Sequence, residues 1–248
     1  MDDLWLRVFQ PAPERPISLV CLPHAGGSAS SFFGFSSALD ASAEVVAVQY
    51  PGRQNRWRDQ PVANLLDLAD AISDAVLGGI TGPVALFGHS MGAALAFEVT
   101  RRLERAGTEP VRLFASGSRA PSLERSEGVH ELDDEGLISE LIRLGGTDPR
   151  LLADREMVQL MLPAVRADYT AIETYRAADD VTVACPITVL TGDDDPKTTL
   201  DSARAWARHT TADCEVLVYP GGHFFLFDDV QRTADDVSKA LAGSRLAG

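Results

Sequence analysis

Short runs of apolar residues, rich in valine, leucine and isoleucine, alternate along the 248-residue chain with longer segments whose apolar residues recur at helical spacing. Most of the runs are apolar at every position, which is typical of strands in a sheet that helices cover on both faces. The alternation predicts an α/β fold with one mostly parallel central sheet and right-handed helical crossovers. The predicted strands are residues 17–22, 45–48, 83–87, 111–116, 187–190 and 215–219.

Residues 62–77 and 91–105 are the clearest predicted helices. In each, apolar residues recur every three or four positions and form one stripe. An apolar stripe must be buried, so both helices are expected to pack on the sheet. The stripe residues are Leu65, Ala69, Ile72 and Val76 in the first helix and Leu95, Val99 and Leu103 in the second.

The regular alternation breaks between about residues 123 and 178, where no run looks like a strand. Three short amphipathic segments occur there, separated by glycine or proline at 145–146, 148–149 and 163. Their apolar residues have helical spacing and must cover something. We interpret residues 123–178 as a helical lid over an active site. The alternative is an ordinary helical excursion packed on the edge of the sheet.

The composition indicates the class of protein. With 45% apolar residues, 248 residues can bury one substantial core, so residues 1–248 are expected to form a single domain. The net charge of −14 argues against nucleic-acid binding, which needs Lys and Arg to neutralise phosphates. The acidic N-terminus is unlike a secretory signal, and no segment could span a bilayer. We therefore expect a cytoplasmic protein without a membrane partner, by default a monomer.

The three cysteines, Cys21, Cys185 and Cys214, lie within or beside apolar runs. None has a neighbouring histidine or cysteine at the spacing of a zinc site. They are expected to pack in the core in a reducing compartment, and no metal or cofactor is expected.

The most specific local signal is GHSMG at residues 88–92, which directly follows an apolar run and directly precedes a predicted helix. A G-x-S-x-G sequence between a strand and a helix is typical of a nucleophile elbow, in which a tight turn exposes the serine. Glycine is needed two residues before and after Ser90 because side chains there would collide in the turn. Ser90 is therefore the predicted nucleophile, near the positive end of the following helix.

A serine hydroxyl needs a base, and His223 is the best of five candidates. It follows the last predicted strand in a glycine-rich loop, YPGGHFF. His89 is expected to point away from Ser90. His130 and His209 are expected to face solvent, the first in the insertion and the second on a surface helix.

An acid must orient the base, and three adjacent aspartates, Asp193, Asp194 and Asp195, follow the strand at 187–190. Their position gives the chain order Ser, Asp, His of the α/β-hydrolases. Composition alone does not choose among the three. Glu124, which follows the strand at 111–116, is a competing location for the acid.

Two backbone amides are expected to stabilise the oxyanion that forms when Ser90 attacks a carbonyl. One is the amide of Met91, directly after the nucleophile. The other is expected from the PHAGG turn at residues 23–27, where Ala25 is the favoured donor. His24 is expected either to orient this turn or to contact substrate, with a purely structural role as the alternative.

Six segments between residues 17 and 227 together resemble the type II thioesterases, the stand-alone editing enzymes of polyketide and nonribosomal peptide assembly lines. The segments are PHAGGSASSFF, VQYPGRQNR, LFGHSMGAALAFE, SGSRAP, TGDDDP and YPGGHFFLF. PHAGG and PGR are more specific than the elbow, which lipases share. The resemblance implies an α/β-hydrolase fold and catalytic residues Ser90, Asp195 and His223. It also implies hydrolysis of aberrant acyl groups from the phosphopantetheine arm of an acyl or peptidyl carrier protein.

A lid over such a site would supply an apolar acyl pocket. Met157, Met161, Tyr169 and Phe225 are the residues expected to line it, although core packing is an alternative role for each. Carrier proteins are generally acidic, so docking to this acidic chain requires a local basic area. The expected docking residues are Arg53 and Arg56, near the entrance of the site, and a merely solvated surface is the alternative.

Two other functions remain open from the sequence. The same triad could serve an oxygen-ester hydrolase or an acyltransferase. A binding protein that kept the fold but lost its chemistry is the alternative from another class, although all three triad residues are present here.

Overall fold

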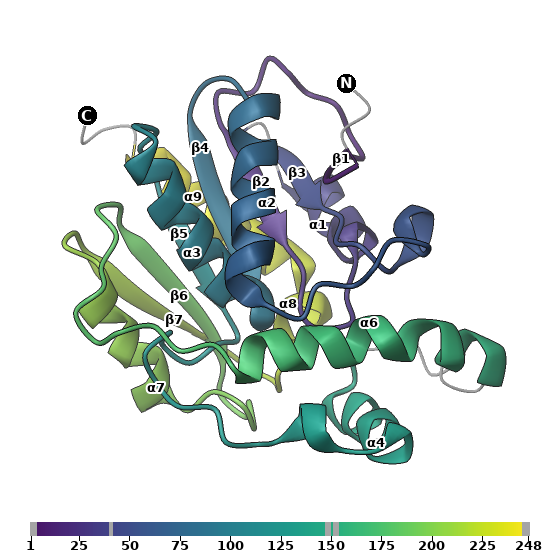
Figure 1. Cartoon of the computed structure of the whole chain (residues 1–248). Helices are drawn as coiled ribbons and strands as arrows, with labels where there is room; N and C mark the ends of the chain where they lie inside the picture. The colour runs from purple at the N-terminus through teal and green to yellow at the C-terminus, as the bar shows by residue number, and fades with distance from the viewer. Residues whose placement is uncertain (1–3, 40–41, 147–149, 151–153, 245–248) are drawn as a thin grey trace.

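The computed structural model describes residues 4–39, 42–146, 150 and 154–244 (Figure 1). Seven strands within these residues form one sheet in the order β1-β3-β2-β4-β5-β6-β7. Strand β1 pairs antiparallel with β3, and the other neighbouring strands pair parallel. The strands are β1 (Leu6–Val8), β2 (Ser18–Leu22), β3 (Glu44–Val48), β4 (Val84–His89), β5 (Leu113–Ser116), β6 (Ile187–Gly192) and β7 (Cys214–Tyr219).

All six strands predicted from the apolar runs are present, with ends shifted by one or two residues. The prediction missed β1, whose three residues, Leu6–Val8, lie at the edge of the sheet and are all partly or fully exposed. A strand this short at an edge needs no continuous apolar run, so its pattern carried no signal.

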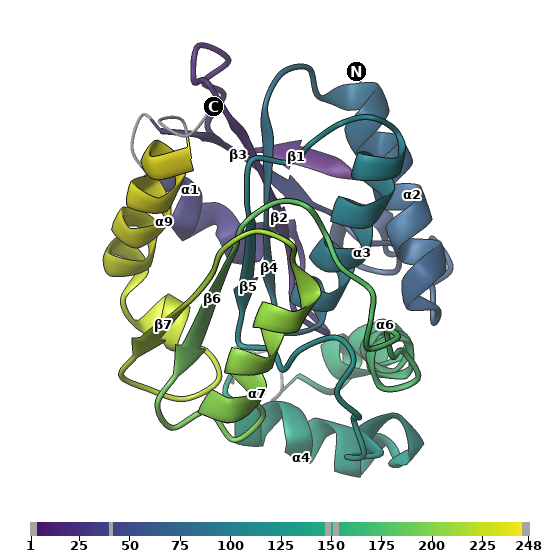
Figure 2. The same ribbon diagram turned by 90° about the vertical axis from the view of Figure 1, so that its left-hand side faces the viewer.

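Helices cover both faces of the sheet, as Figure 2 shows. On one face α2 (Leu65–Gly79) packs against α3 (Met91–Arg105), and on the other α1 (Phe33–Ala38) packs against α9 (Val230–Ser244). All stripe residues predicted for α2 and α3 are buried. The remaining helices outside the lid are α7 (Leu200–Arg204), α8 (Phe225–Asp228) and the 3₁₀ turns η1 (Ala29–Phe32), η2 (Gln54–Arg56) and η4 (Ala205–His209). This is the predicted α/β-hydrolase architecture.

The predicted lid region contains η3 (Val129–Glu131), α4 (Asp134–Leu144) and α6 (Arg155–Glu173). Figure 1 shows α6 as one long helix crossing the molecule below the sheet, with α4 beneath it. The expected break at Pro163 was wrong, because α6 continues through it. Buried residues before and after the proline belong to one apolar cluster with α4, and that packing outweighs the local cost of proline in a helix. The expected separator at 148–149 lies outside the described residues.

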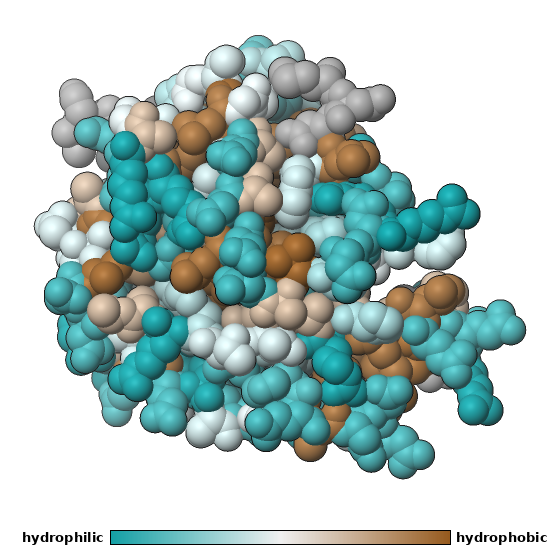
Figure 3. Space-filling model, viewed as in Figure 1, coloured by the Kyte–Doolittle hydropathy of each residue, from teal (hydrophilic) through white to brown (hydrophobic). Residues whose placement is uncertain are grey.

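The exposed surface of the predicted lid is partly apolar. Figure 3 shows apolar residues gathered around the outer end of α6, where Met157 and Leu160 are exposed.

Cys21 and Cys185 are buried and Cys214 is half-buried, and none of the three forms a disulfide. None of the helices in the described part of the chain is long and apolar enough to cross a membrane.

Candidate active site

Ser90 lies at the sharp turn between β4 and α3. Its φ of 57° and ψ of −115° lie outside the regions that non-glycine residues ordinarily adopt. A Cβ on Gly88 would lie 2.0 Å from the carbonyl oxygen of Gly92, across the turn. A Cβ on Gly92 would lie 2.0 Å from the carbonyl oxygen of Leu22 on the neighbouring strand. The two glycines are therefore required by different contacts, one within the turn and one with β2.

Three side chains from distant parts of the chain form a continuous relay. His223 Nε2 lies 2.9 Å from Ser90 Oγ, and His223 Nδ1 lies 3.0 Å from both carboxylate oxygens of Asp195. The His223 and Asp195 side chains are 3% and 0% exposed. A carboxylate only accepts, so Nδ1 carries the proton and, in the neutral ring, Nε2 accepts from the Ser90 hydroxyl. This arrangement can draw a proton from the serine.

The structure distinguishes the three adjacent aspartates. Asp195 is buried against His223, and its Oδ1 also accepts from the amide of Lys197 at 2.8 Å. Asp193 and Asp194 are exposed, and the Asp193 carboxylate accepts from the amide of Gly221 at 2.9 Å. Glu124, the alternative location for the acid, is exposed. Asp195 is therefore the aspartate that can orient His223.

Two further histidines are buried beside the relay. His89 points away from Ser90, with Nδ1 3.0 Å from Ser116 Oγ, and its ring lies 5.2 Å from that of His223. Burial lowers the pKa of His89 well below its usual range, and His223 and His24 lower it further. Burial, followed by His223 and Arg53, lowers the pKa of His24 to about 3. Both rings are therefore neutral at neutral pH.

The expectation that His209 faces solvent was wrong. Its side chain is fully buried, with Nδ1 2.8 Å from the carbonyl oxygen of Val181 and Nε2 2.9 Å from Ser122 Oγ. The histidine joins the end of η4 to two loops, and both of its ring nitrogens are paired, as buried polar atoms require. His130 is partly exposed, and its Nδ1 lies 2.6 Å from a carboxylate oxygen of Glu173.

The two expected oxyanion donors border the same cavity as Ser90 and His223. Met91 is the first residue of α3, and the first amides of an α-helix have no carbonyl partner within the helix. Ala25 lies in the turn after β2, which is anchored on both sides: the Tyr50 hydroxyl donates to the carbonyl of Pro23 at 3.0 Å, and the Gly26 amide donates to Asp168 at 2.8 Å.

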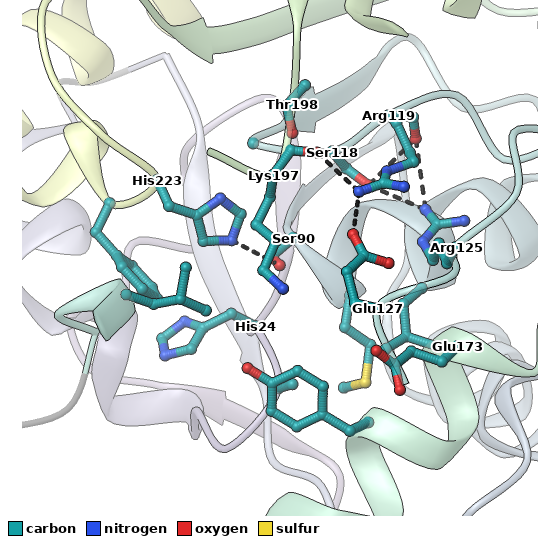
Figure 4. Close-up of a pocket in the computed structure, with 17 residues that line it drawn as sticks. His24, Ser90, Ser118, Arg119, Arg125, Glu127, Glu173, Lys197, Thr198 and His223 are labelled. Carbon is teal, nitrogen blue, oxygen red and sulfur yellow. Dashed lines mark hydrogen bonds and ion pairs between the residues drawn. The ribbon is translucent and has the colours of Figure 1, made fainter. Parts of the chain in front are cut away.

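The cavity beside Ser90 has an empty volume of about 590 Å³, its open mouth included. Figure 4 shows His223 and His24 on one side of Ser90 and a group of charged side chains on the other. Of the residues expected to contact substrate, His24 and Tyr169 border it. Within the described residues no group of three His, Cys, Asp or Glu side chains could hold a metal ion.

The family model described as a thioesterase domain matches residues 17–241. The chain belongs to the thioesterase family. The probable cadicidin biosynthesis thioesterase of Streptomyces griseus is 47% identical over 243 residues, which cover 98% of this thioesterase and 67% of that protein. Thioesterase PikA5 of Streptomyces venezuelae is 46% identical over 246 residues, which cover 98% of this thioesterase and 88% of PikA5. The solved structure of the type II thioesterase BorB from the borrelidin biosynthetic cluster superposes with a TM-score of 0.90 at 43% identity. The superposition covers 97% of this thioesterase and 99% of the BorB chain.

These similarities confirm the resemblance to the type II thioesterases and the α/β-hydrolase fold. The protein is accordingly an enzyme of the thioester-hydrolysing class.

Three of the residues expected to line the acyl pocket of this thioesterase do not border the cavity. Met157 is 42% exposed on the outer part of α6, and Met161 packs in the apolar cluster of the lid. Phe225 is buried in the core, stacked on Tyr219 with ring centres 5.0 Å apart. Helical spacing indicates that a face is apolar but not what it covers, so the cavity positions could not be separated from core positions.

The expectation that Arg53 and Arg56 form a surface docking area was also wrong. Arg53 is bidentate with Asp168 of α6, at 2.5 and 2.8 Å, and its Nη1 also donates to the carbonyl of Gly27 at 3.0 Å. Arg56 is 8% exposed, and its guanidinium lies over the ring of Trp5. The irregular loops after β2 and β3 bury carbonyls that need donors, and a guanidinium supplies several at once.

The charged wall of the cavity in this thioesterase was not predicted from the sequence. Arg119, Arg125, Glu127 and Lys197 border the cavity, and Figure 4 shows the first three on the side of Ser90 away from His223 and Lys197 directly beside Ser90. A usable signal was present, because Arg119 and Lys197 each follow a parallel strand within a few residues. Residues after the carboxyl ends of parallel strands gather at one edge of the sheet, where ligands bind.

Proposed function

We propose that this thioesterase hydrolyses acyl groups held as thioesters on the phosphopantetheine arm of an acyl or peptidyl carrier protein, as an editing enzyme of polyketide or nonribosomal peptide synthesis. The observation that carries the proposal is the relay from Ser90 through His223 to Asp195, which opens into a cavity in a member of the thioesterase family. Similarity to a cadicidin biosynthesis thioesterase and to BorB supports the assignment to an assembly line.

The first half of the reaction acylates the enzyme. Ser90 Oγ attacks the thioester carbonyl while His223 Nε2 accepts the serine proton, over the 2.9 Å that separates the two atoms. Asp195 stabilises the imidazolium that forms. The amides of Met91 and Ala25 donate to the oxyanion, and each such donor is typically worth about 3 kcal/mol in the transition state. The intermediate then collapses, the C–S bond breaks, and His223 returns the proton to the leaving thiolate.

The second half releases the acid. Water enters the position vacated by the pantetheine thiol and attacks the acyl carbonyl, with His223 as the base. The same two amides stabilise the second oxyanion, and collapse returns the proton to Ser90 Oγ. The carrier protein leaves with a free thiol, ready to be loaded again. Leu144 at the end of α4 and Tyr169 and Ile172 of α6 border the cavity, which supports a role of these helices in covering the acyl group during both steps.

The mechanism is tested at Ser90. Ser90→Ala should lower kcat on an acyl-carrier thioester by roughly 10⁴-fold or more, whereas Ser37→Ala, an exposed serine on α1, should leave it unchanged. A serine-directed phosphonate should add to Ser90, as mass spectrometry of the labelled peptide would show. An active Ser90→Ala enzyme, or a phosphonate adduct elsewhere, would refute the acyl-enzyme route.

The substrate class is tested by comparing leaving groups. kcat/KM should be higher for an acyl thioester on a carrier protein or pantetheine than for the matched oxygen ester. An equal or higher value for the oxygen ester would favour an ester hydrolase with the same triad. Arg53, whose side chain is 10% exposed, and Arg56, which is 8% exposed, do not form the carrier-protein docking surface. The cytoplasmic location, the single domain and the monomeric state stay predictions.

A further inference from the structure

Lys197 lies two residues after Asp195, the aspartate that orients His223, and it is held at three points. Its backbone amide donates to Asp195 Oδ1 at 2.8 Å, and its carbonyl accepts from Arg119 Nη2 at 3.1 Å. Its ammonium group lies 2.6 Å from Oε1 of Glu140, which belongs to α4. The first contact helps to orient the carboxylate of Asp195, so the other two fix the residue on which that orientation depends.

The ion pair between Lys197 and Glu140 is largely withdrawn from solvent, with the two side chains 15% and 10% exposed. Glu140 also accepts two hydrogen bonds from Arg143, at 2.8 and 2.9 Å. Burial raises the pKa of Glu140, but the hydrogen bonds from Arg143 and Lys197 outweigh it and hold the pKa below its usual value. Glu140 is therefore a carboxylate at neutral pH. Water screens a pair with so little exposure much less than it screens a pair on the surface, so this contact can hold two segments together.

The end of α4 also touches the loop that carries His223. Leu144, the last residue of α4, borders the cavity. A Cβ on Gly146 would lie 2.0 Å from Cζ of Phe224, so the backbone just after α4 lies directly against that ring. The ring centre of Phe224 lies 5.1 Å from that of its neighbour His223. The loop of the acid therefore meets α4 at Glu140, and the loop of the base meets the chain just after α4 at Gly146.

Lys197 borders the cavity together with Ser90 (Figure 4), so contact with substrate is the competing role for its side chain. The ammonium group is already matched by Glu140, and an anionic substrate would have to break that pair before it could bind. Loss of one partner would leave the other charge largely buried and uncompensated, which is costly. The contacts of Lys197 therefore favour a supporting role over substrate binding.

We propose that Lys197 and Glu140 are positioning residues, whose ion pair fastens α4 to the loop of Asp195 and so holds the relay from Ser90 through His223 to Asp195 in its working geometry. The inference rests on the proposed function, because it takes that relay as the catalytic one. Asp195 fixes the tautomer of His223 and stabilises the imidazolium, and a displaced carboxylate does both less well. The ion pair therefore acts on the chemical step, and its loss should appear in kcat more than in KM.

The experiment measures thiol release from acetyl-pantetheine and butyryl-pantetheine by the whole chain. Lys197→Met replaces the ammonium side chain by an apolar one of similar size, and Glu140→Gln removes the partner charge. The double variant completes the cycle. Asp134→Asn is the control, because Asp134 joins α4 to Arg166 of α6 through another ion pair, at 2.7 Å. A serine-directed phosphonate titrates Ser90 to completion, so kcat is expressed per reactive serine and unfolded protein is not counted.

Lys197→Met and Glu140→Gln should each lower kcat by about tenfold on both thioesters, a fraction of the roughly 10⁴-fold that the acid itself contributes. KM should change by less than about twofold. The rate of phosphonate labelling at Ser90 should fall by a similar factor to kcat, although no acyl group takes part. The double variant should lose little more than either single variant, because both substitutions remove the same contact. Asp134→Asn should keep the wild-type kcat.

An unchanged kcat in both single variants would overturn the proposal. So would a rise in KM that differs between the two thioesters, since that result would make Lys197 a substrate-binding residue. Losses that multiply in the double variant would show that the two side chains act separately, and an equal fall in kcat in Asp134→Asn would show that any loosening of α4 has this effect; either result refutes the inference.

Failure of this inference is distinguishable from failure of the proposed function. If the wild-type enzyme hydrolyses both thioesters and the variants do so equally well, the thioesterase proposal stands and only the positioning role is refuted. If the wild-type enzyme hydrolyses neither thioester, and none on a carrier protein, the proposed function itself fails.

Discussion

The ion pair between Arg53 and Asp168 joins α6 to the turn at residues 23–27, which contains the proposed oxyanion donor Ala25, and its removal tests how the site is positioned. The Asp168 side chain is 1% exposed and accepts three hydrogen bonds, two from Arg53 and one from the amide of Gly26. Asp168 belongs to α6, whereas Gly26 adjoins the expected oxyanion donor Ala25. The carboxylate of Asp168 therefore joins α6 to Arg53 and to the turn that contains Gly26.

The structure sets the size of the effect. Asp168→Ala leaves a nearly buried guanidinium without its counter-charge, which typically costs about 3–5 kcal/mol of unfolding free energy. Arg53→Met should cost a similar amount for the reciprocal reason. In the double variant neither charge remains, so its loss of unfolding free energy should be smaller than the sum of the losses in the two single variants by about 2 kcal/mol or more. The loosened turn should also misplace Ala25. Loss of a whole oxyanion donor lowers kcat by about 10²–10³-fold, so a displaced donor should lower it by roughly ten- to a hundredfold, with less change in KM.

Urea unfolding of the four proteins gives the stability cycle, and thiol release from an acyl-pantetheine gives kcat and KM. Asp59→Ala is the matched control, because Asp59 pairs with Arg56 but is 41% exposed, and such pairs contribute about 1 kcal/mol or less. If each single variant lost less than about 1 kcal/mol of unfolding free energy and the two losses were additive, the pair would not stabilise the protein as a buried ion pair. A stability loss without a fall in kcat would refute the link to the oxyanion turn.

Three further predictions concern single positions. Asp195→Asn should lower kcat by about 10⁴-fold by upsetting the imidazole tautomer, whereas the adjacent, exposed Asp194→Asn should leave kcat nearly unchanged; comparable kinetics for the two would exclude Asp195 as the acid. The folded-state pKa of His24 is about 3, below the unfolded value of about 6.5, so stability is retained above pH 6.5 and lost as the pH falls toward 3. His24→Asn should therefore remove about 2 kcal/mol of the stability difference between pH 7 and pH 5 in urea titrations, and an unaltered pH dependence would contradict this. Gly92→Ala should destabilise the protein by about 3 kcal/mol or more, because the added Cβ would meet the carbonyl of Leu22. Gly78→Ala in α2 should raise the unfolding free energy by about 0.5–1 kcal/mol, because no atom lies within 4 Å of the added Cβ. Thermal melts of both variants test the two predictions.

The sequence by itself determined the features that depend on neighbouring residues. Apolar runs specify which segments are buried strands, and all six predicted strands occur in the parallel part of the sheet. Gly88 and Gly92 mark the turn at Ser90 because only glycine fits backbone contacts so close. Ser90, Asp195 and His223 follow β4, β6 and β7 in the sequence, and the carboxyl ends of parallel strands lie at one edge of the sheet, so the sequence placed all three at the same edge.

Outside the Ser90–His223–Asp195 relay, the tertiary structure alone decided which charged and polar side chains meet. Nothing near Arg53 in the sequence shows that its partner, Asp168, lies 115 residues away on α6. A charge that was predicted to lie on a docking surface therefore forms an ion pair inside the protein. Pro163 looked like a helix end, but packing on both sides keeps α6 continuous. Arg125 and Thr198 reach one cavity only because two strand ends lie side by side. Local patterns record burial and turns, whereas the partner of a charged or polar group is set by the folding of distant segments against each other.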